Sequence, residues 1–128
     1  MKILGIGVDI VQNKRIRNLT RNNNFISRTF GKKEIQISKR FPNKTNYFAK
    51  RFSAKEALVK AIGTGFRFNL NFKDIQILND KLGKPYFSKT KKIDDIIFKK
   101  FKIKKYDLFL SMSDEKDYSV SFTILKVQ

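Results

Sequence analysis

The sequence contains neither cysteine nor histidine. The absence of cysteine excludes disulfides and thiolate nucleophiles, and the absence of both residue types excludes His/Cys zinc sites and Ser–His–Asp triads. Any metal must therefore be a hard cation held by oxygen atoms, with Mg²⁺ the first candidate. Any general base must be a carboxylate, a lysine, a tyrosine or a metal-bound water.

Long apolar runs are also missing, since none approaches the roughly 18 residues that a membrane-spanning helix needs. The apolar run at the N-terminus is interrupted by Asp9 and lacks the small-residue cleavage site of a signal peptide. We therefore interpret residues 2–11 as a buried strand. We predict a cytoplasmic protein that does not bind a membrane.

Acidic residues are few, with 11 Asp and Glu against 29 Lys and Arg, for a formal net charge of +18. Such an excess indicates an anionic partner, which could be nucleic acid, an acidic protein, a phosphorylated metabolite or a membrane surface. An AT-rich coding bias is the alternative, because it enriches Lys, Ile, Asn and Phe without selection for binding.

Hydrophobic residues make up 41% of the 128 residues, enough for one packed domain over residues 1–128. Periodicity and turn residues predict short basic helices first, then a long central helix, then paired strands. In the first half of the chain we expect helices over 12–21, 25–30 (closed by Gly31) and 32–40, and then a long helix capped by Asn46 and ended by Gly63 and Gly65. In the second half we expect a strand over 72–78 that turns at 79–85 to pair with Tyr86-Phe87, a helix over 91–101, and a hairpin of 106–113 with 118–125. The predicted fold class is α+β, with an antiparallel sheet.

Asp9 is out of place in an apolar strand, because a buried carboxylate needs a cation or a set of donors. It could cap a helix that starts near residues 11–12, or it could be a metal ligand. Gly5 and Gly7 stand at alternate positions of the same run. Glycine weakens a strand unless another backbone or a ligand comes close to it.

The central helix carries charge toward its apolar side. Glu56 falls on the border of the apolar stripe, Lys60 lies one turn further on, and Lys55 points into the stripe. Glu56 and Lys60 could be an ordinary i,i+4 pair on a solvated flank. A second carboxylate nearby would instead indicate a functional cluster.

Five stretches, taken together and in order, resemble one family over nearly the whole chain. They are GIGVDIV at 5–11 with Arg15-Ile16, RFSAKEA at 51–57 with KAIGTG at 60–65, FKDIQI at 72–77, GKP at 83–85, and SMS at 111–113 with YSV at 118–120. These stretches resemble the holo-(acyl-carrier-protein) synthases, the 4′-phosphopantetheinyl transferases of fatty-acid synthesis.

The resemblance implies transfer of 4′-phosphopantetheine from coenzyme A (CoA) to a serine of acyl carrier protein, with release of 3′,5′-ADP. It implies Mg²⁺ held by Asp9 and Glu56 together with the CoA pyrophosphate, and a homotrimer whose active sites lie between protomers. Glu56, Asp9 or a metal-bound water then accepts the serine proton, and Lys60 stabilises or protonates the leaving phosphate.

For binding, the resemblance implies that Arg15 docks the acidic carrier. Gly83, Lys84 and Pro85 are expected to approach the CoA nucleotide, although GKP could be an ordinary hairpin turn. Ser113 is assigned to substrate binding. Many relatives have histidine, associated with the 3′-phosphate of CoA, where this chain has Asp114. An aspartate would repel that phosphate. Either nearby Lys or Arg residues take over its binding, or the affinity for CoA is reduced, or the loop is displaced.

Two rival functions follow from other features of the sequence. Charge and abundant Phe and Tyr suggest a small nucleic-acid-binding module, but the aromatic residues fall at helix and strand periods, which predicts core positions rather than an exposed stacking platform. We therefore predict no nucleic-acid partner. The substitution at Asp114 keeps open a structural trimer without activity.

Overall fold

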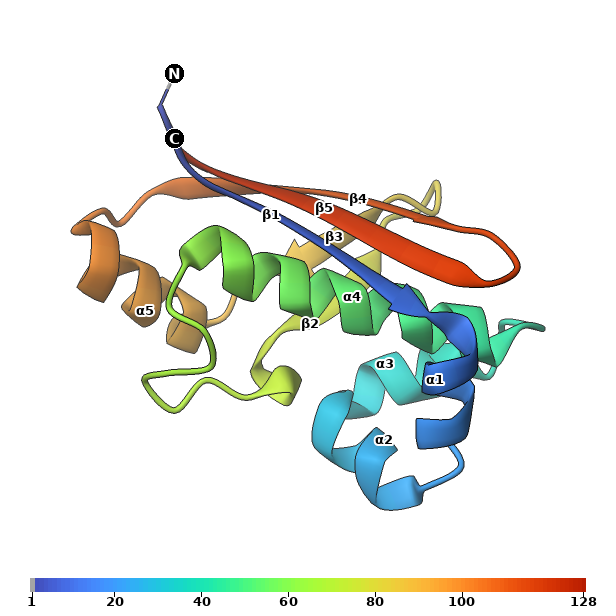
Figure 1. The fold of residues 1–128 in the computed structure, drawn as a ribbon. Coiled ribbons are helices and arrows are strands. Elements are labelled where there is room, and N and C mark those ends of the chain that lie inside the picture. Colours follow the sequence, from blue (N-terminus) through green and yellow to red (C-terminus); the bar gives the residue numbers. More distant parts are fainter. Residues whose placement is uncertain (1) are drawn as a thin grey trace.

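The computed structural model describes residues 2–128, which form an α+β fold with two antiparallel sheets (Figure 1). In chain order the elements are β1 (Ile3–Gln12), α1 (Asn13–Leu19), α2 (Asn23–Thr29), α3 (Lys32–Ser38), α4 (Lys44–Ile62), the 3₁₀ helix η1 (Phe72–Asp74), β2 (Gln76–Asn79), β3 (Pro85–Ser88), α5 (Lys91–Phe101), β4 (Tyr106–Asp114) and β5 (Tyr118–Val127). The larger sheet has the strand order β1–β5–β4, and β2 pairs with β3 separately. The fold class predicted from the sequence is confirmed.

Helix α4 is central, and its two ends are capped differently from one another. At its start the side chain of Asn43 accepts the Asn46 N–H at 3.0 Å, so Asn43 is the cap and the prediction of Asn46 was wrong. At its end Gly63 adopts a left-handed conformation (φ 81°) and donates its N–H to the Val59 carbonyl, as the sequence predicted.

Two other boundaries differ from the prediction. Residues 72–74 form η1 instead of strand, because the Asp74 carboxylate accepts the Asn71 N–H at 2.8 Å and closes a local turn. Gly31 does not close α2; its N–H is accepted by the Glu34 carboxylate at the start of α3. The helix over 91–101 and the C-terminal hairpin are confirmed.

Strand β1 and helix α4 meet through their backbones at two glycines. A Cβ added at Gly5 would lie 1.8 Å from the Ala61 carbonyl oxygen, and one at Gly7 would lie 1.8 Å from that of Ala57. The close approach expected from these glycines is therefore the contact with α4. The inner face of β5 also carries small side chains against α4, where Ser53 and Ser121 share a hydroxyl hydrogen bond of 2.6 Å.

The hydrophobic core has two parts, which pack on successive stretches of α4: residues 54–62 belong to one part and residues 47–52 to the other. One lies between α4, α5 and the larger sheet, and the other lies between α4 and the three N-terminal helices. All helices lie on one side of the larger sheet (Figure 1), so its other face is uncovered in a single chain. Within residues 2–128, no helix has the length and apolar character needed to cross a bilayer.

The prediction that the aromatic residues are core residues was only partly right. Six of the 13 phenylalanines are exposed, because periodicity identifies a face of an element without saying whether that face is covered. Two of them, Phe109 and Phe122, lie on the uncovered sheet face, and Phe66 lies in the loop after α4.

Candidate active site

Asp9 lies within β1, which continues to Gln12 before α1 begins. The residue that precedes α1 is Gln12, and its side chain makes no capping hydrogen bond. Asp9 therefore does not cap this helix, and that alternative was wrong. Its side chain, only 17% exposed, instead lies beside α4 and forms an ion pair with Lys60.

Lys60 joins the two elements by donating hydrogen bonds to the Val8 carbonyl at 2.9 Å and to Asp9 Oδ1 at 3.2 Å. Glu56 precedes Lys60 by one helical turn and is half-buried. Burial, and next the negative charge of Asp9, raise the pKa of Glu56, while Lys60 and Arg15 act in the opposite direction. The fold thus brings Asp9, which is distant in the sequence, to Glu56 and Lys60 of α4, and Lys60 pairs with Asp9 across the two elements.

A separate cavity of about 650 Å³ lies at the opposite edge of the larger sheet, where Met112 of β4 forms part of its wall. Gly83 and Pro85 of the β2–β3 turn line it, and Gly83 has φ 91°. Four cationic side chains also line the cavity: Lys33, Arg40, Lys50 and Arg51. Of the predicted site residues, Gly83 and Pro85 therefore lie apart from the cluster at β1.

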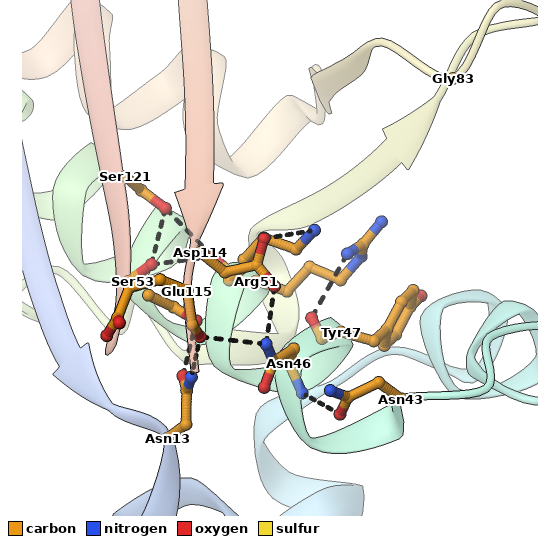
Figure 2. A network of polar contacts seen from close by, with 12 residues as sticks. Asn13, Asn43, Asn46, Tyr47, Arg51, Ser53, Gly83, Asp114, Glu115 and Ser121 are labelled. Carbon is orange, nitrogen blue, oxygen red and sulfur yellow. Dashed lines mark hydrogen bonds and ion pairs between the residues drawn. The ribbon is translucent and has the colours of Figure 1, made fainter. Parts of the chain in front are cut away.

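Arg51 is a functional candidate that the sequence reasoning missed. It is 2% exposed, yet it lines the cavity, and its guanidinium lies 3.7 Å from the Tyr47 ring centroid (Figure 2). It donates hydrogen bonds to the Tyr47 carbonyl and to Asn79 Oδ1, whereas its Nε has no partner within residues 2–128. A guanidinium that lines a cavity is suited to binding an anion.

Asp114, at the end of β4, is held by the first turns of α4 (Figure 2). Its carboxylate accepts a hydrogen bond from Asn46 Nδ2 at 2.7 Å and lies 3.6 Å from Lys50 Nζ. Lys50 also lines the cavity, so the aspartate is neutralised by one of the cations in the cavity wall. The adjacent Ser113 does not line the cavity; together with Asp114 it lines a separate groove that also contains Ile10 and Tyr118.

Comparison with known proteins identifies the family. Residues 5–123 match the 4′-phosphopantetheinyl transferase superfamily. The chain is 60% identical over 126 residues to a holo-(acyl-carrier-protein) synthase of Pelagibacter ubique, with 98% of both chains covered, and 43% identical over 131 residues to that of Wolbachia pipientis, with 98% and 99% covered. The chain belongs to the holo-(acyl-carrier-protein) synthases.

Solved structures agree with this identification. A holo-(acyl-carrier-protein) synthase from Neisseria meningitidis superposes with a TM-score of 0.85 at 38% identity, covering 97% of this chain and 98% of that one. The synthase from Bacillus anthracis, solved in complex with CoA (3′,5′-ADP), has a TM-score of 0.82 at 30% identity and full coverage of both chains. Like the rest of its family, the chain transfers 4′-phosphopantetheine from CoA to acyl carrier protein.

A second feature of this synthase that the sequence did not reveal is an apolar groove beside Arg15. The Arg15 guanidinium lies 5.9 Å from the Phe52 ring centroid, and the Phe52 and Phe72 rings are stacked at 5.3 Å. From Phe72 the groove, of about 470 Å³, extends between α2 and the loop that follows α4; its lining residues are Phe25, Arg28, Thr29, Phe66, Leu70, Asn71 and Phe72.

Proposed function

We propose that the transfer takes place at the cluster of Asp9, Glu56 and Lys60, with the serine of the carrier attacking the β-phosphorus of CoA. The ion pair of Lys60 with Asp9, one turn from Glu56, is the observation that carries this assignment. The cluster combines two carboxylates with an ammonium group that is half-exposed and therefore accessible to substrate phosphates.

The donor atoms of this cluster fit Mg²⁺. Among residues 2–128, no group of three or more His, Cys, Asp or Glu side chains is placed to hold a metal ion by itself. The cluster offers two carboxylates, and Asp9 is close enough to Glu56 for its charge to raise the pKa of that residue. Mg²⁺ is commonly bound in this way, with substrate phosphate oxygens and water completing its coordination. The repulsion by which Asp9 raises the pKa of Glu56 also favours a cation between them. When bound, the ion neutralises the pyrophosphate charge.

The side chains of the cluster can account for the proton and charge transfers. Glu56 is the proposed acceptor of the serine proton, because it is a half-buried carboxylate one helical turn from Lys60. The new bond forms between the serine oxygen and the β-phosphorus, while the bond to the bridging oxygen of 3′,5′-ADP breaks. Lys60 stabilises the charge on the leaving phosphate.

The cavity at the other edge of the sheet is proposed to bind the CoA nucleotide. Its four cationic side chains outnumber the one carboxylate in the lining, Asp80, and together with the Gly83 backbone they suit a phosphorylated ligand. Lys84, exposed in the same turn, can add a further positive charge. Arg51, Lys33 and Arg40 thus provide the cationic phosphate site that Asp114 cannot provide, while Lys50 is paired with Asp114.

The separation of cluster and cavity supports a homotrimer with shared active sites. The cluster lies at β1 and the cavity lies at β4, and these strands are opposite edges of one sheet. A single ligand therefore reaches both most simply where the cluster of one copy meets the cavity of another. The uncovered sheet face is apolar, and Ile6, Val8 and Ile10 are each more than half exposed. Exposed apolar patches of this kind mark association surfaces.

Complementation tests this arrangement. Glu56→Gln and Arg51→Ala chains are each expected to be inactive alone. When the two chains mix at random in a trimer, about a quarter of wild-type activity should return. Each shared site takes Glu56 from one chain and Arg51 from its neighbour, and about one site in four then has both residues intact. Co-expression that yields mixed trimers without activity would contradict shared sites. Phe122→Glu should dissociate the trimer in light scattering, whereas Phe98→Glu, on the exposed face of α5, should not.

Docking of the acidic carrier is assigned to Arg15 and the neighbouring apolar groove. Arg15 provides charge complementarity, and Phe25, Phe66 and Phe72 provide an apolar surface next to it. We further propose that the chain works in the cytoplasm. Incubation of apo carrier with CoA and Mg²⁺ should add the mass of phosphopantetheine to the carrier. An unchanged carrier mass would favour a trimer without activity.

A further inference from the structure

The buried ammonium group of Lys55 has no role in the proposed chemistry. Lys55 lies on α4, one residue before Glu56, and its side chain is completely buried. Its Nζ donates three hydrogen bonds. The acceptors are Glu34 Oε1 at 2.7 Å, the Thr29 carbonyl at 2.8 Å and the Phe72 carbonyl at 3.0 Å. All three donors of the ammonium are used, which offsets the desolvation that lowers the pKa of Lys55.

Two of these acceptors belong to the opposite walls of the apolar groove. Thr29 ends α2, which forms one wall, and Phe72 ends the loop that forms the other. The third acceptor, Glu34, is itself fixed, because its carboxylate also accepts the N–H groups of Gly31 and Ile77. The Nζ atom of Lys55 therefore bonds to both walls of the groove. Its own position is fixed by α4, which carries Lys55, and by Glu34 of α3.

We propose that Lys55 is a positioning residue for carrier recognition that sets the spacing of the two groove walls. The inference rests on the proposed docking of the carrier at Arg15 and the groove. A buried ion pair is not required for stability, since apolar residues of similar volume often replace such pairs without loss. An apolar side chain could fill the space of Lys55, but it could not bond the carbonyls of Thr29 and Phe72.

The test compares three variants by the KM for apo carrier, the KM for CoA and kcat. Lys55→Met/Glu34→Gln removes the wall bonds and both charges at nearly constant volume, so that no buried charge is left unpaired. We expect its KM for carrier to rise about tenfold, with the KM for CoA and kcat within about twofold of wild type. Glu34→Gln keeps the wall bonds and should leave the KM for carrier unchanged, even where it lowers the melting temperature.

Ile97→Ala is the matched control, because Ile97 is completely buried in the other part of the core. It should lower the melting temperature without a change in the KM for carrier. The inference is overturned if the folded double variant keeps the wild-type KM for carrier, if the KM for CoA rises equally, or if Glu34→Gln raises the KM for carrier. Absence of transfer by the wild-type chain would instead overturn the proposed function.

Discussion

The Lys60 ammonium reaches from α4 to β1, where it lies 3.2 Å from Asp9 Oδ1. Lys60 is thus paired with Asp9, the carboxylate that we propose as a ligand of Mg²⁺. The pairing makes Lys60 a competitor of the metal as well as a partner of the leaving phosphate, and the two roles can be separated experimentally.

Lys60→Ala should lower kcat by about 10²-fold or more, because a charge that stabilises the leaving group is lost. The same change should lower the Mg²⁺ concentration needed for half-maximal rate, since Asp9 is freed from its ion pair. Transfer rates measured over a Mg²⁺ titration report both quantities. Lys91→Ala, which removes an exposed ion pair in α5, should change neither. A higher Mg²⁺ requirement in Lys60→Ala would argue against competition.

Glu56→Gln should reduce kcat by about 10²- to 10⁴-fold, the usual contribution of a general base. Its free energy of unfolding should not fall, because burial and Asp9 both disfavour the charged carboxylate. Single-turnover transfer and thermal denaturation test the two expectations. Asp95→Asn, an exposed carboxylate of α5, serves as the control. Wild-type turnover in Glu56→Gln would refute the assignment of this residue.

Gly7→Ala should destabilise the protein by about 1–3 kcal/mol, as expected where a methyl group is forced into a packed contact. The added Cβ would overlap the Ala57 carbonyl oxygen and push β1 away from α4. Asp9 would move with the strand, so activity should fall as well. Gly31→Ala is the control, since the nearest atom lies 3.5 Å from its new Cβ. Denaturant unfolding of both variants gives the comparison, and equal stability would contradict the backbone contact.

Arg51→Lys should raise the KM for CoA about tenfold or more while leaving the KM for carrier unchanged, because lysine keeps the charge but loses the fork of donors. Initial rates with each substrate varied in turn separate the two constants. A rise in the KM for carrier alone would contradict the binding of the CoA nucleotide in this cavity.

The KM for carrier should rise steeply with ionic strength, because docking at Arg15 is electrostatic. Arg15→Ala should raise this KM at low salt and reduce its dependence on salt. Lys104→Ala, beyond the C-terminal end of α5, removes the same charge at a site away from the groove and should preserve the salt dependence. If the KM stays flat between low and high salt, Arg15 is not part of the docking surface.

Much of this fold could be predicted from local signals in the sequence. The turn residues around Gly83 and the alternation after Tyr106 predicted both hairpins, and the glycines at 5 and 7 predicted a close approach. The cap of α4 was misplaced because Asn43 and Asn46 both suit that position, and only the observed hydrogen bond distinguishes them.

Less of the candidate site than of the fold could be predicted from the sequence. Asp9, Glu56 and Lys60 could be predicted as a cluster because each lies in a motif that resembles the family. The role of Arg51 depends instead on its hydrogen bond to Asn79 and on a cavity built from several elements. The groove beside Arg15 likewise depends on α2 meeting the loop after α4, a long-range contact without a local signal.

At Gly5 and Gly7 the distance between β1 and α4 is determined by main-chain atoms alone. Substitutions at exposed positions elsewhere in the chain leave this backbone contact in place. A lineage can therefore drift toward lysine and asparagine over most of its surface while its two acidic groups keep their relative placement.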